Sequence, residues 1–252
     1  MLNIIGIGLS DEKDISVKGL ELVKNSDVIY LESYTSLLQV PLLTLEKFYG
    51  KKVLLADRAT VEQKAEELLL KPAKKQVVSL LVIGDSLFAT THVDLIARAH
   101  EMKIPVAVVH NASVLTAIGA TGLQLYKFGK TASIPFTHEG YEPDSPYTIL
   151  AENHSIGAHT LFLLDLKPDE NKFMTVKQAI EYLLLLEKKH GKKLITETTL
   201  VVGCARLGSD SQKIISGKAK DVLKKDFGKP VHCLIMPGKL HFMEEDCLKQ
   251  FS

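Results

Sequence analysis

Short apolar runs alternate with amphipathic segments along the first half of the chain. The runs at 2–7 and 77–83 have the length of strands whose two faces are both buried. Strands that alternate with helical segments of ordinary length predict βαβ units and a mostly parallel sheet. The predicted strands are 2–7, 28–31, 52–56, 77–83 and 105–110, and helices are predicted from the N-cap Ser16, from Thr60 with a capping box to Gln63, and over 93–102.

The pattern changes after about residue 119, where glycines and aromatic residues interrupt it. Strand-like and helix-like segments continue without regular alternation, which favours a mixed sheet. The expected fold is therefore two α/β domains, 1–118 with a mostly parallel sheet and 119–252 with a mixed sheet. The strands predicted in the second half are 131–135, 159–166, 199–205 and 230–236, and the helices are 146–154, 175–189 with Gly191 as its stop, and 242–251.

Composition limits the possible functions. The 252 residues carry 31 basic and 30 acidic side chains, and a net charge of +1 argues against nucleic-acid binding driven by overall electrostatics. The three cysteines are widely spaced and lack a CxxC pair, which indicates reduced thiols and not a disulfide framework or a zinc site. The sequence shows no basic leader and no apolar run of about 18 residues, so we expect a cytoplasmic protein without a membrane partner.

Two glycine-containing turns directly follow buried strands, GIGLSD (6–11) and GDSLFATTH (84–92). In open α/β sheets, ligands bind where the chain leaves the carboxyl ends of the strands, so both turns are expected to border one small-molecule site. The first turn has Asp11 where a dinucleotide fingerprint has its third glycine, and an acidic residue is a poor neighbour for phosphate. It is therefore either a tight turn alone or a contact for a ligand without phosphates.

Several polar residues near strand ends allow two interpretations each. Glu32 is either a ribose-binding carboxylate or a solvated charge, and Ser113 is either a helix N-cap or a ligand contact. His92, His110 and His232 lack the i,i+4 spacing of a metal-binding helix and have no evident carboxylate partner, so no metal site is predicted. No nucleophile elbow and no P-loop is present, which argues against hydrolases of that type and nucleotide kinases.

A set of segments, in order along the chain, carries a resemblance to a known family. They are GIGLSDEKDISVKGLE at the start, YLESYTS (30–36), GDSLFATTH (84–92), HNAS (110–113), GLQLYKFGKT (122–131), HTLFLLDLK (159–167), VVGCARLGSDSQKI (201–214) and PVHCLI (230–235). Together they resemble the diphthine synthases, S-adenosylmethionine-dependent methyltransferases of the tetrapyrrole-methylase-like group. The resemblance implies two α/β domains with the cofactor in the cleft between them, and a homodimer.

The family's cofactor contacts fall on apolar and polar positions of these segments. The resemblance implies that S-adenosylmethionine, and its product S-adenosylhomocysteine, contact Leu9, Asp85, Phe88, Ser113, Val114, Leu164, Leu207 and His232. It assigns no catalytic residue. The chain departs from the family pattern at Ser86, where proline is common, and in a short loop over 165–175, which puts substrate contacts from that loop in doubt.

The resemblance also implies an acceptor. The family methylates the aminocarboxypropyl-modified histidine of translation elongation factor 2 in diphthamide biosynthesis. YLESYTS and HNAS are similar to the eukaryotic form, which gives a trimethylated amine plus a methyl ester. The alternatives are trimethylation only, as in the archaeal form, and a methyltransferase for a tetrapyrrole or another small molecule. A non-catalytic binding module is disfavoured because GDSLF, NASV and PVHC are intact.

Overall fold

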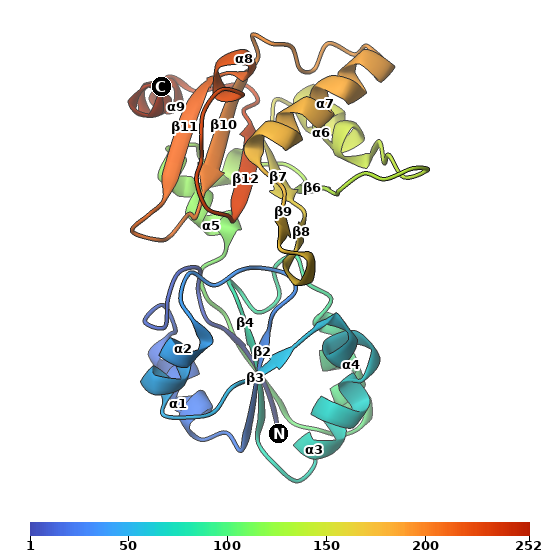
Figure 1. The fold of residues 1–252 in the computed structure, drawn as a ribbon, viewed down its shortest axis with the longest axis vertical. Helices are drawn as coiled ribbons and strands as arrows, with labels where there is room; N and C mark the ends of the chain where they lie inside the picture. Colours follow the sequence, from blue (N-terminus) through green and yellow to red (C-terminus); the bar gives the residue numbers. More distant parts are fainter. The chain divides into compact units, whose positions relative to one another are not determined.

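The computed structural model describes residues 1–252, and the chain divides into two compact units, Met1–Val114 and Leu115–Ser252 (Figure 1). Helix α5 (Val114–Ala117) begins at the division. Each unit is built on its own five-stranded sheet. No helix combines the length and the apolar character that a membrane crossing requires.

The N-terminal unit is a parallel sheet covered by helices. Its elements are β1 (Leu2–Gly6), α1 (Val17–Lys24), β2 (Val28–Glu32), α2 (Leu42–Tyr49), β3 (Leu54–Ala56), α3 (Lys71–Ala73), β4 (Val78–Val82), α4 (Val93–Glu101) and β5 (Val106–Val109). The strand order is β3-β2-β4-β1-β5, and every neighbouring pair is parallel, as predicted. In Figure 1, α1 and α2 lie on one face and α3 and α4 on the other.

Burial on both faces explains why these strands are continuous apolar runs. Leu2 and Ile4 of β1 belong to one apolar cluster, whereas Ile5 and Ile7 belong to another. Alternate residues of a strand point to opposite faces, so each face of β1 contacts its own layer of helices. Ser16 caps α1 as predicted, since its hydroxyl accepts from the backbone N–H of Gly19.

The predicted capping box of Thr60 and Gln63 is wrong. The carboxylate of Asp57 accepts from the backbone N–H of Thr60 at 2.7 Å, and the following segments, Ala59–Gln63 and Glu66–Leu70, are π-helical turns. The acidic side chain three residues earlier satisfies a backbone N–H of the first turn, which is the role that the prediction gave to Thr60.

The C-terminal unit is a mixed sheet, as predicted. Its elements are β6 (Ala132–Ile134), α6 (Ser145–Ser155), β7 (Thr160–Leu164), α7 (Val176–His190), β10 (Leu200–Ala205), β11 (Lys213–Lys218), α8 (Ala219–Val222), β12 (His232–Met236) and α9 (Phe242–Leu248). The order is β11-β10-β12-β7-β6, in which β6 and β7 are parallel and the other pairs antiparallel. Helix α7 ends at Gly191 in the left-handed conformation, as the sequence indicated.

Several elements of this unit were not predicted, among them β11, α8 and a hairpin between β7 and α7. In the edge strand β11 only Ser216 is buried, and the strand lacks a long apolar run. Between β7 and α7, the strands β8 (Leu166–Lys167) and β9 (Lys172–Phe173) form a small antiparallel hairpin. The shortened 165–175 segment is therefore an ordered hairpin.

Candidate functional site

Three adjacent strands of the N-terminal sheet, β4, β1 and β5, end at one edge, and the loops after them contain the predicted N-terminal site. The first two loops are joined by backbone hydrogen bonds, since Gly84 N–H donates to Gly8 O at 2.6 Å and Gly8 N–H donates to Gly84 O at 3.2 Å. Both glycines have positive φ, +83° for Gly8 and +86° for Gly84. Residues with side chains rarely adopt this conformation, so the junction requires glycine.

The same junction brings predicted residues together. A Cβ atom added to Gly84 would lie 3.8 Å from Cδ2 of Leu9 and 3.9 Å from Cα of Ser113. The space beside Gly84 is thus bordered by the loops after β1 and β5. At Gly6, by contrast, a Cβ atom would lie only 2.7 Å from the carbonyl oxygen of Gly84, so the strands approach too closely for any side chain.

Asp85 connects the loops after β4 and β5. Its Oδ1 accepts from Leu87 N–H at 2.9 Å, and its Oδ2 accepts from Asn111 N–H at 3.0 Å and from Nδ1 of His110 at 2.9 Å. Partial burial opposes ionisation, but the two backbone donors and His110 outweigh it and lower the pKa of Asp85. The carboxylate is therefore ionised at neutral pH and holds two loops of the site in a fixed relation.

Two further residues organise this edge, and the sequence reasoning gave neither a role. The side-chain amide of Asn111 donates to Gly6 O and to Asp14 O, both at 3.0 Å. The Asp14 carboxylate accepts from the backbone N–H groups of Leu9 and Ser10. An asparagine directly after a buried strand is the signal that would have marked Asn111, because its side chain bonds backbone groups at turns.

The expectation that the histidines lack carboxylate partners is wrong for two of them. His110 contacts Asp85, as above, and Nε2 of His92 lies 3.2 Å from Oε2 of Glu32, with both side chains fully buried. The interpretation of Glu32 as a solvated charge is wrong for the same reason. Residues 32 and 92 become neighbours because β2 pairs with β4, which the order of segments along the chain does not reveal.

The three residues implied in the C-terminal unit lie at one edge of its sheet. His232 opens β12 opposite Ala205 of β10, Leu207 follows the end of β10, and Leu164 ends β7 beside the start of β12. All three are buried or nearly so. Burial lowers the pKa of His232, whose Nε2 donates to the carbonyl oxygen of Lys229 at 3.0 Å. His232 is therefore neutral at pH 7.

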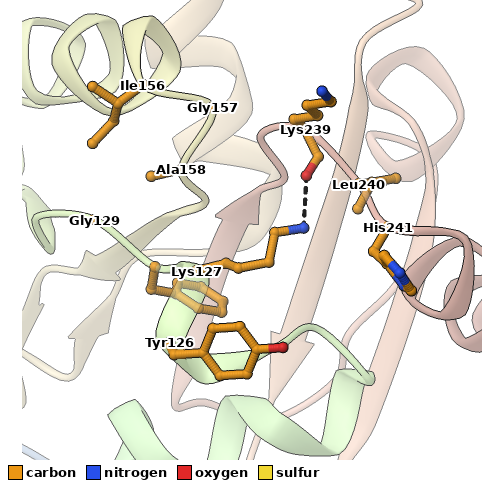
Figure 2. A pocket seen from close by; sticks show the side chains of 10 residues that line it. Tyr126, Lys127, Gly129, Ile156, Gly157, Ala158, Lys239, Leu240 and His241 are labelled. Atoms are coloured by element: carbon orange, nitrogen blue, oxygen red, sulfur yellow. Dashed lines mark hydrogen bonds between the residues drawn. The ribbon is translucent and has the colours of Figure 1, made fainter.

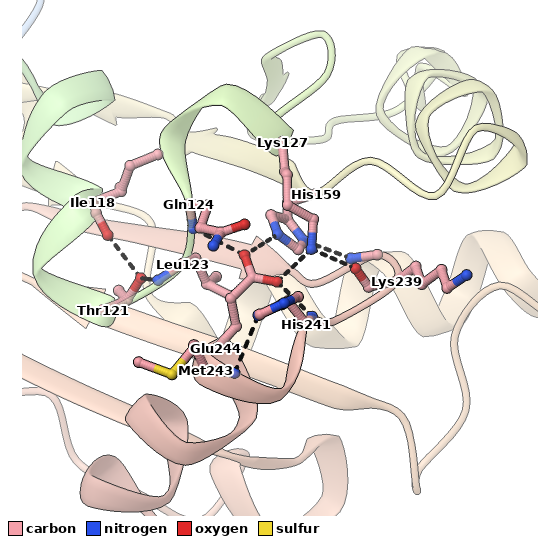
Figure 3. A network of polar contacts seen from close by, with 11 residues as sticks. Ile118, Thr121, Leu123, Gln124, Lys127, His159, Lys239, His241, Met243 and Glu244 are labelled. Atoms are coloured by element: carbon pink, nitrogen blue, oxygen red, sulfur yellow. Dashed lines mark hydrogen bonds and ion pairs between the residues drawn. The ribbon is translucent and has the colours of Figure 1, made fainter.

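Near α9, the C-terminal unit contains a dense polar network (Figure 3). The buried carboxylate of Glu244 accepts from the backbone N–H groups of Gln124 (2.9 Å) and His241 (2.8 Å), from Nε2 of His159 (3.0 Å) and from the ammonium of Lys127. Desolvation would raise its pKa, but these donors lower the pKa of Glu244 to about 2. The four donors therefore satisfy both oxygens of the buried Glu244 carboxylate.

Next to this network lies a pocket of about 490 Å³ (Figure 2). Tyr126, Ile156, Lys239 and His241 are among the residues around it, and the ammonium of Lys127 reaches across to the carbonyl oxygen of Lys239 at 2.7 Å. None of the predicted site residues lines this pocket.

The residues at the β4-β1-β5 edge fit S-adenosylmethionine better than a nucleotide phosphate. The gap beside Gly84 is bordered by the apolar side chain of Leu9 and by backbone, and the ionised Asp85 is a poor neighbour for an anion. The structure contains no group of three or more His, Cys, Asp or Glu side chains placed to hold a metal ion.

Comparison with known proteins assigns the chain to a family. Residues 1–223 match the family described as Tetrapyrrole (Corrin/Porphyrin) Methylases. The chain belongs to the tetrapyrrole methylase family. This membership, together with the two α/β sheets, confirms the predicted fold class and makes the chain a methyltransferase, and it implies the use of S-adenosylmethionine.

Individual tetrapyrrole methylase relatives match almost from end to end. The diphthine methyl ester synthase of Dictyostelium discoideum is 47% identical, with 100% of this chain and 98% of the relative covered. The diphthine synthase of Methanocaldococcus jannaschii is 45% identical, with 99% and 98% covered. A crystal structure of diphthine synthase superposes with a TM-score of 0.91 at 38% identity and covers 100% of this chain and 95% of that one. The resemblance found in the sequence is confirmed.

Proposed function

We propose that the chain methylates the aminocarboxypropyl-modified histidine of translation elongation factor 2, giving a trimethylated amine plus a methyl ester, in diphthamide biosynthesis. The observation that carries this proposal is the nearly complete coverage of proteins named diphthine synthase and diphthine methyl ester synthase. Identity alone does not separate the two activities, because the eukaryotic and archaeal relatives are 47% and 45% identical. The proposal that the product includes a methyl ester is based on the segments YLESYTS and HNAS, which are similar to those of the eukaryotic form.

The proposed cofactor is S-adenosylmethionine, which supplies an electrophilic methyl carbon on a sulfonium. The loops at the β4-β1-β5 edge are joined by hydrogen bonds of Gly8, Asp85 and Asn111 without a ligand. This pre-formed arrangement supports binding of the cofactor there. A pre-formed site loses little entropy on binding and can hold the reacting groups close together. The proposed contacts are Leu9, Asp85, Phe88, Ser113 and Val114 in one unit and Leu164, Leu207 and His232 in the other.

Asp85 is proposed to act mainly through the loops. Its three hydrogen bonds to Leu87, Asn111 and His110 occupy most of its acceptor sites. Its ionised carboxylate also places a negative charge close to the proposed cofactor, whose sulfonium is positive. No residue is proposed as a general base for the acceptor amine.

Mass spectrometry of precursor-bearing elongation factor 2, incubated with the protein and S-adenosylmethionine, tests this proposal. A gain of four methyl groups that falls to three after mild alkali supports it, because alkali hydrolyses a methyl ester and leaves trimethylammonium intact. A gain of three methyl groups, unchanged by alkali, would indicate the archaeal-type activity. No gain on the protein, together with methylation of a porphyrinoid, would indicate a small-molecule methyltransferase.

Binding of the cofactor can be tested without the acceptor. We propose that S-adenosylmethionine and S-adenosylhomocysteine bind in excess chelator, because the site contains carboxylate, hydroxyl and apolar groups and no metal-ligating cluster. Calorimetry that shows binding only after a metal is added would contradict this. We also propose a homodimer, as the resemblance implies, and sedimentation at several protein concentrations measures it.

A further inference from the structure

The loop 84–92 has a buried base and an accessible tip. Ser86 and His92, at its two ends, are fully buried, whereas Ala89 at its tip is exposed and Phe88 is half-buried. Ala89 has φ +54°, a left-handed conformation that costs free energy in a residue with a side chain. Contacts at the base must therefore hold the tip in shape.

His92 supplies these contacts with both of its ring nitrogens. Nδ1 lies 3.1 Å from the carbonyl oxygen of Ser86, and Nε2 lies 3.2 Å from the carboxylate of Glu32 at the end of β2. The ring thus connects the two ends of the loop to each other and to the sheet. Neither oxygen of the Glu32 carboxylate accepts a hydrogen bond, so the approach of His92 Nε2 at 3.2 Å is an ion-pair contact and not a hydrogen bond.

The chemistry of these neighbours fixes the proton on one side of the ring. A carbonyl oxygen only accepts, so Nδ1 of His92 carries a hydrogen and donates it to Ser86 O. Nε2 faces the Glu32 carboxylate at 3.2 Å, which is close enough for an electrostatic contact, although the geometry is not that of a hydrogen bond.

We propose that Glu32 and His92 are a positioning pair, which holds the loop 84–92 in the shape that presents Asp85 and Phe88 to the cofactor. This inference rests on the proposed function, because it assigns the loop to cofactor binding. Neither side chain touches the ligand itself, since both are fully buried beneath the loop. The pair acts through the backbone of Ser86, which follows Asp85 directly.

Three substitutions separate this role from general stability. Glu32→Leu removes the partner of Nε2, and His92→Phe keeps the volume of the ring but removes both nitrogens. Glu32→Gln is the matched control: its amide N–H can donate to the unprotonated Nε2 of a neutral His92, so the contact survives without charge. Glu32→Gln and His92→Phe both nearly keep the volume of the residue they replace. If the pair served packing alone, both variants would behave like the wild type, whereas the positioning role predicts that only Glu32→Gln does.

Hydrogen exchange of the peptide that covers 84–92, measured without cofactor, reports the local stability of the loop. We expect exchange about tenfold faster in Glu32→Leu and His92→Phe, because a buried donor or acceptor left unpaired costs stability, and the wild-type rate in Glu32→Gln. Peptides from β10 and β12 should be unchanged in all three. Wild-type exchange in both disruptive variants, or fast exchange in Glu32→Gln, would overturn the proposal.

Calorimetry with S-adenosylmethionine links the loop to binding. We expect about tenfold weaker affinity in Glu32→Leu and His92→Phe, and recovery in Glu32→Gln. If the wild-type protein binds no S-adenosylmethionine, the proposed function fails, while the exchange data still decide whether the pair holds the loop. A loosened loop with unchanged affinity would overturn the positioning role alone. If Glu32→Leu does not fold, His92→Phe carries the test.

Discussion

The two units each bury a contact between a glutamate and a histidine, but the two contacts are built differently. Glu244 accepts from four donors, two of them backbone N–H groups and one the ammonium of Lys127, whereas Glu32 accepts no hydrogen bond and lies 3.2 Å from Nε2 of His92. A buried carboxylate whose oxygens all accept hydrogen bonds stabilises one packed arrangement. A buried carboxylate with few hydrogen bonds costs free energy and is kept where it has another role, here in positioning the loop 84–92. The comparison separates a part of the molecule that maintains the fold from a part that shapes a loop.

The histidines differ as well. Nδ1 of His159 accepts from the backbone N–H of Gly238 at 2.8 Å, so its proton is on Nε2, facing Glu244. Nδ1 of His92 instead donates to a carbonyl oxygen. The two imidazole rings are therefore oriented differently: His159 turns its protonated Nε2 toward the ionised carboxylate of Glu244, whereas His92 turns its protonated Nδ1 toward the carbonyl oxygen of Ser86.

The largest expected effect is on stability. Glu244→Ala should lower the free energy of unfolding by about 3–5 kcal/mol, because it removes the counter-charge of a partly buried ammonium and leaves several buried donors without an acceptor. Glu32→Ala should cost about 1–3 kcal/mol, since it removes the carboxylate that lies 3.2 Å from the buried ring nitrogen of His92. Urea unfolding followed by circular dichroism measures both, and equal losses would break the comparison.

The second effect is acid sensitivity. The folded pKa of Glu244 is about 2, below the usual value of 4.5, so its contribution to stability is present above about pH 4.5 and is lost as the pH falls toward 2. The difference corresponds to about 3 kcal/mol. Burial also lowers the pKa of His159, whose protonation below its usual range favours the unfolded state. Glu244→Gln should flatten the fall in stability between pH 5 and pH 2 in denaturant titrations, and an unchanged slope would contradict the assignment.

A third prediction asks whether the loop carboxylate behaves like Glu32. Asp85→Ala should weaken S-adenosylmethionine binding about tenfold or more, because the loops after β4 and β5 lose their common acceptor. Its effect on affinity should exceed its effect on the melting temperature, the reverse of Glu244→Ala. Calorimetry and thermal unfolding of both variants provide the measurement. Unchanged affinity in Asp85→Ala would show that the loops keep their relation without it.

The smallest effect is expected at the tip of the loop. Ala89→Gly removes the cost of a left-handed alanine, and the greater freedom of glycine in the unfolded chain offsets most of that gain. The net change in stability should be within about 1 kcal/mol. Exchange of the 84–92 peptide should stay slow, because the base is intact. Fast exchange would show that the tip contributes to holding the loop.

The parallel sheet could be predicted from the sequence because its strands are buried on both faces and are therefore apolar throughout. Strand β11 was missed because it lies at a sheet edge, where most of its residues stay partly exposed, and its only apolar side chains are those of Ile214 and Ile215. The Glu32–His92 contact could not be predicted, since it depends on the order β2-β4 in the sheet. The capping of the segment after β3 was predicted wrongly because the turn begins earlier than the Thr60 pattern indicated, with the Asp57 carboxylate accepting from the backbone N–H of Thr60.

Some residues of the candidate site could also be predicted from the sequence, and others could not. The turns at Gly8 and Gly84 were predictable from glycines that directly follow apolar runs. The contacts of Asp85 with Asn111 and His110 were not, because they join residues 25 and 26 positions apart through the adjacency of loops. The family resemblance alone assigned Leu164, Leu207 and His232 to the cofactor site. Single leucines and a lone histidine at strand ends carry no specific signal for a ligand.

The close approach at Gly6 bears on how this protein can be re-engineered. Any side chain there would meet the backbone of Gly84 at 2.7 Å, which no rotamer can relieve. A saturation library over this loop region should therefore return only glycine at Gly6, whereas the exposed Ala89 should accept the residues that tolerate a positive φ, such as Gly and Asn, and reject proline and β-branched residues. Efforts to broaden the range of acceptors would best leave the strand junction untouched and diversify the tip.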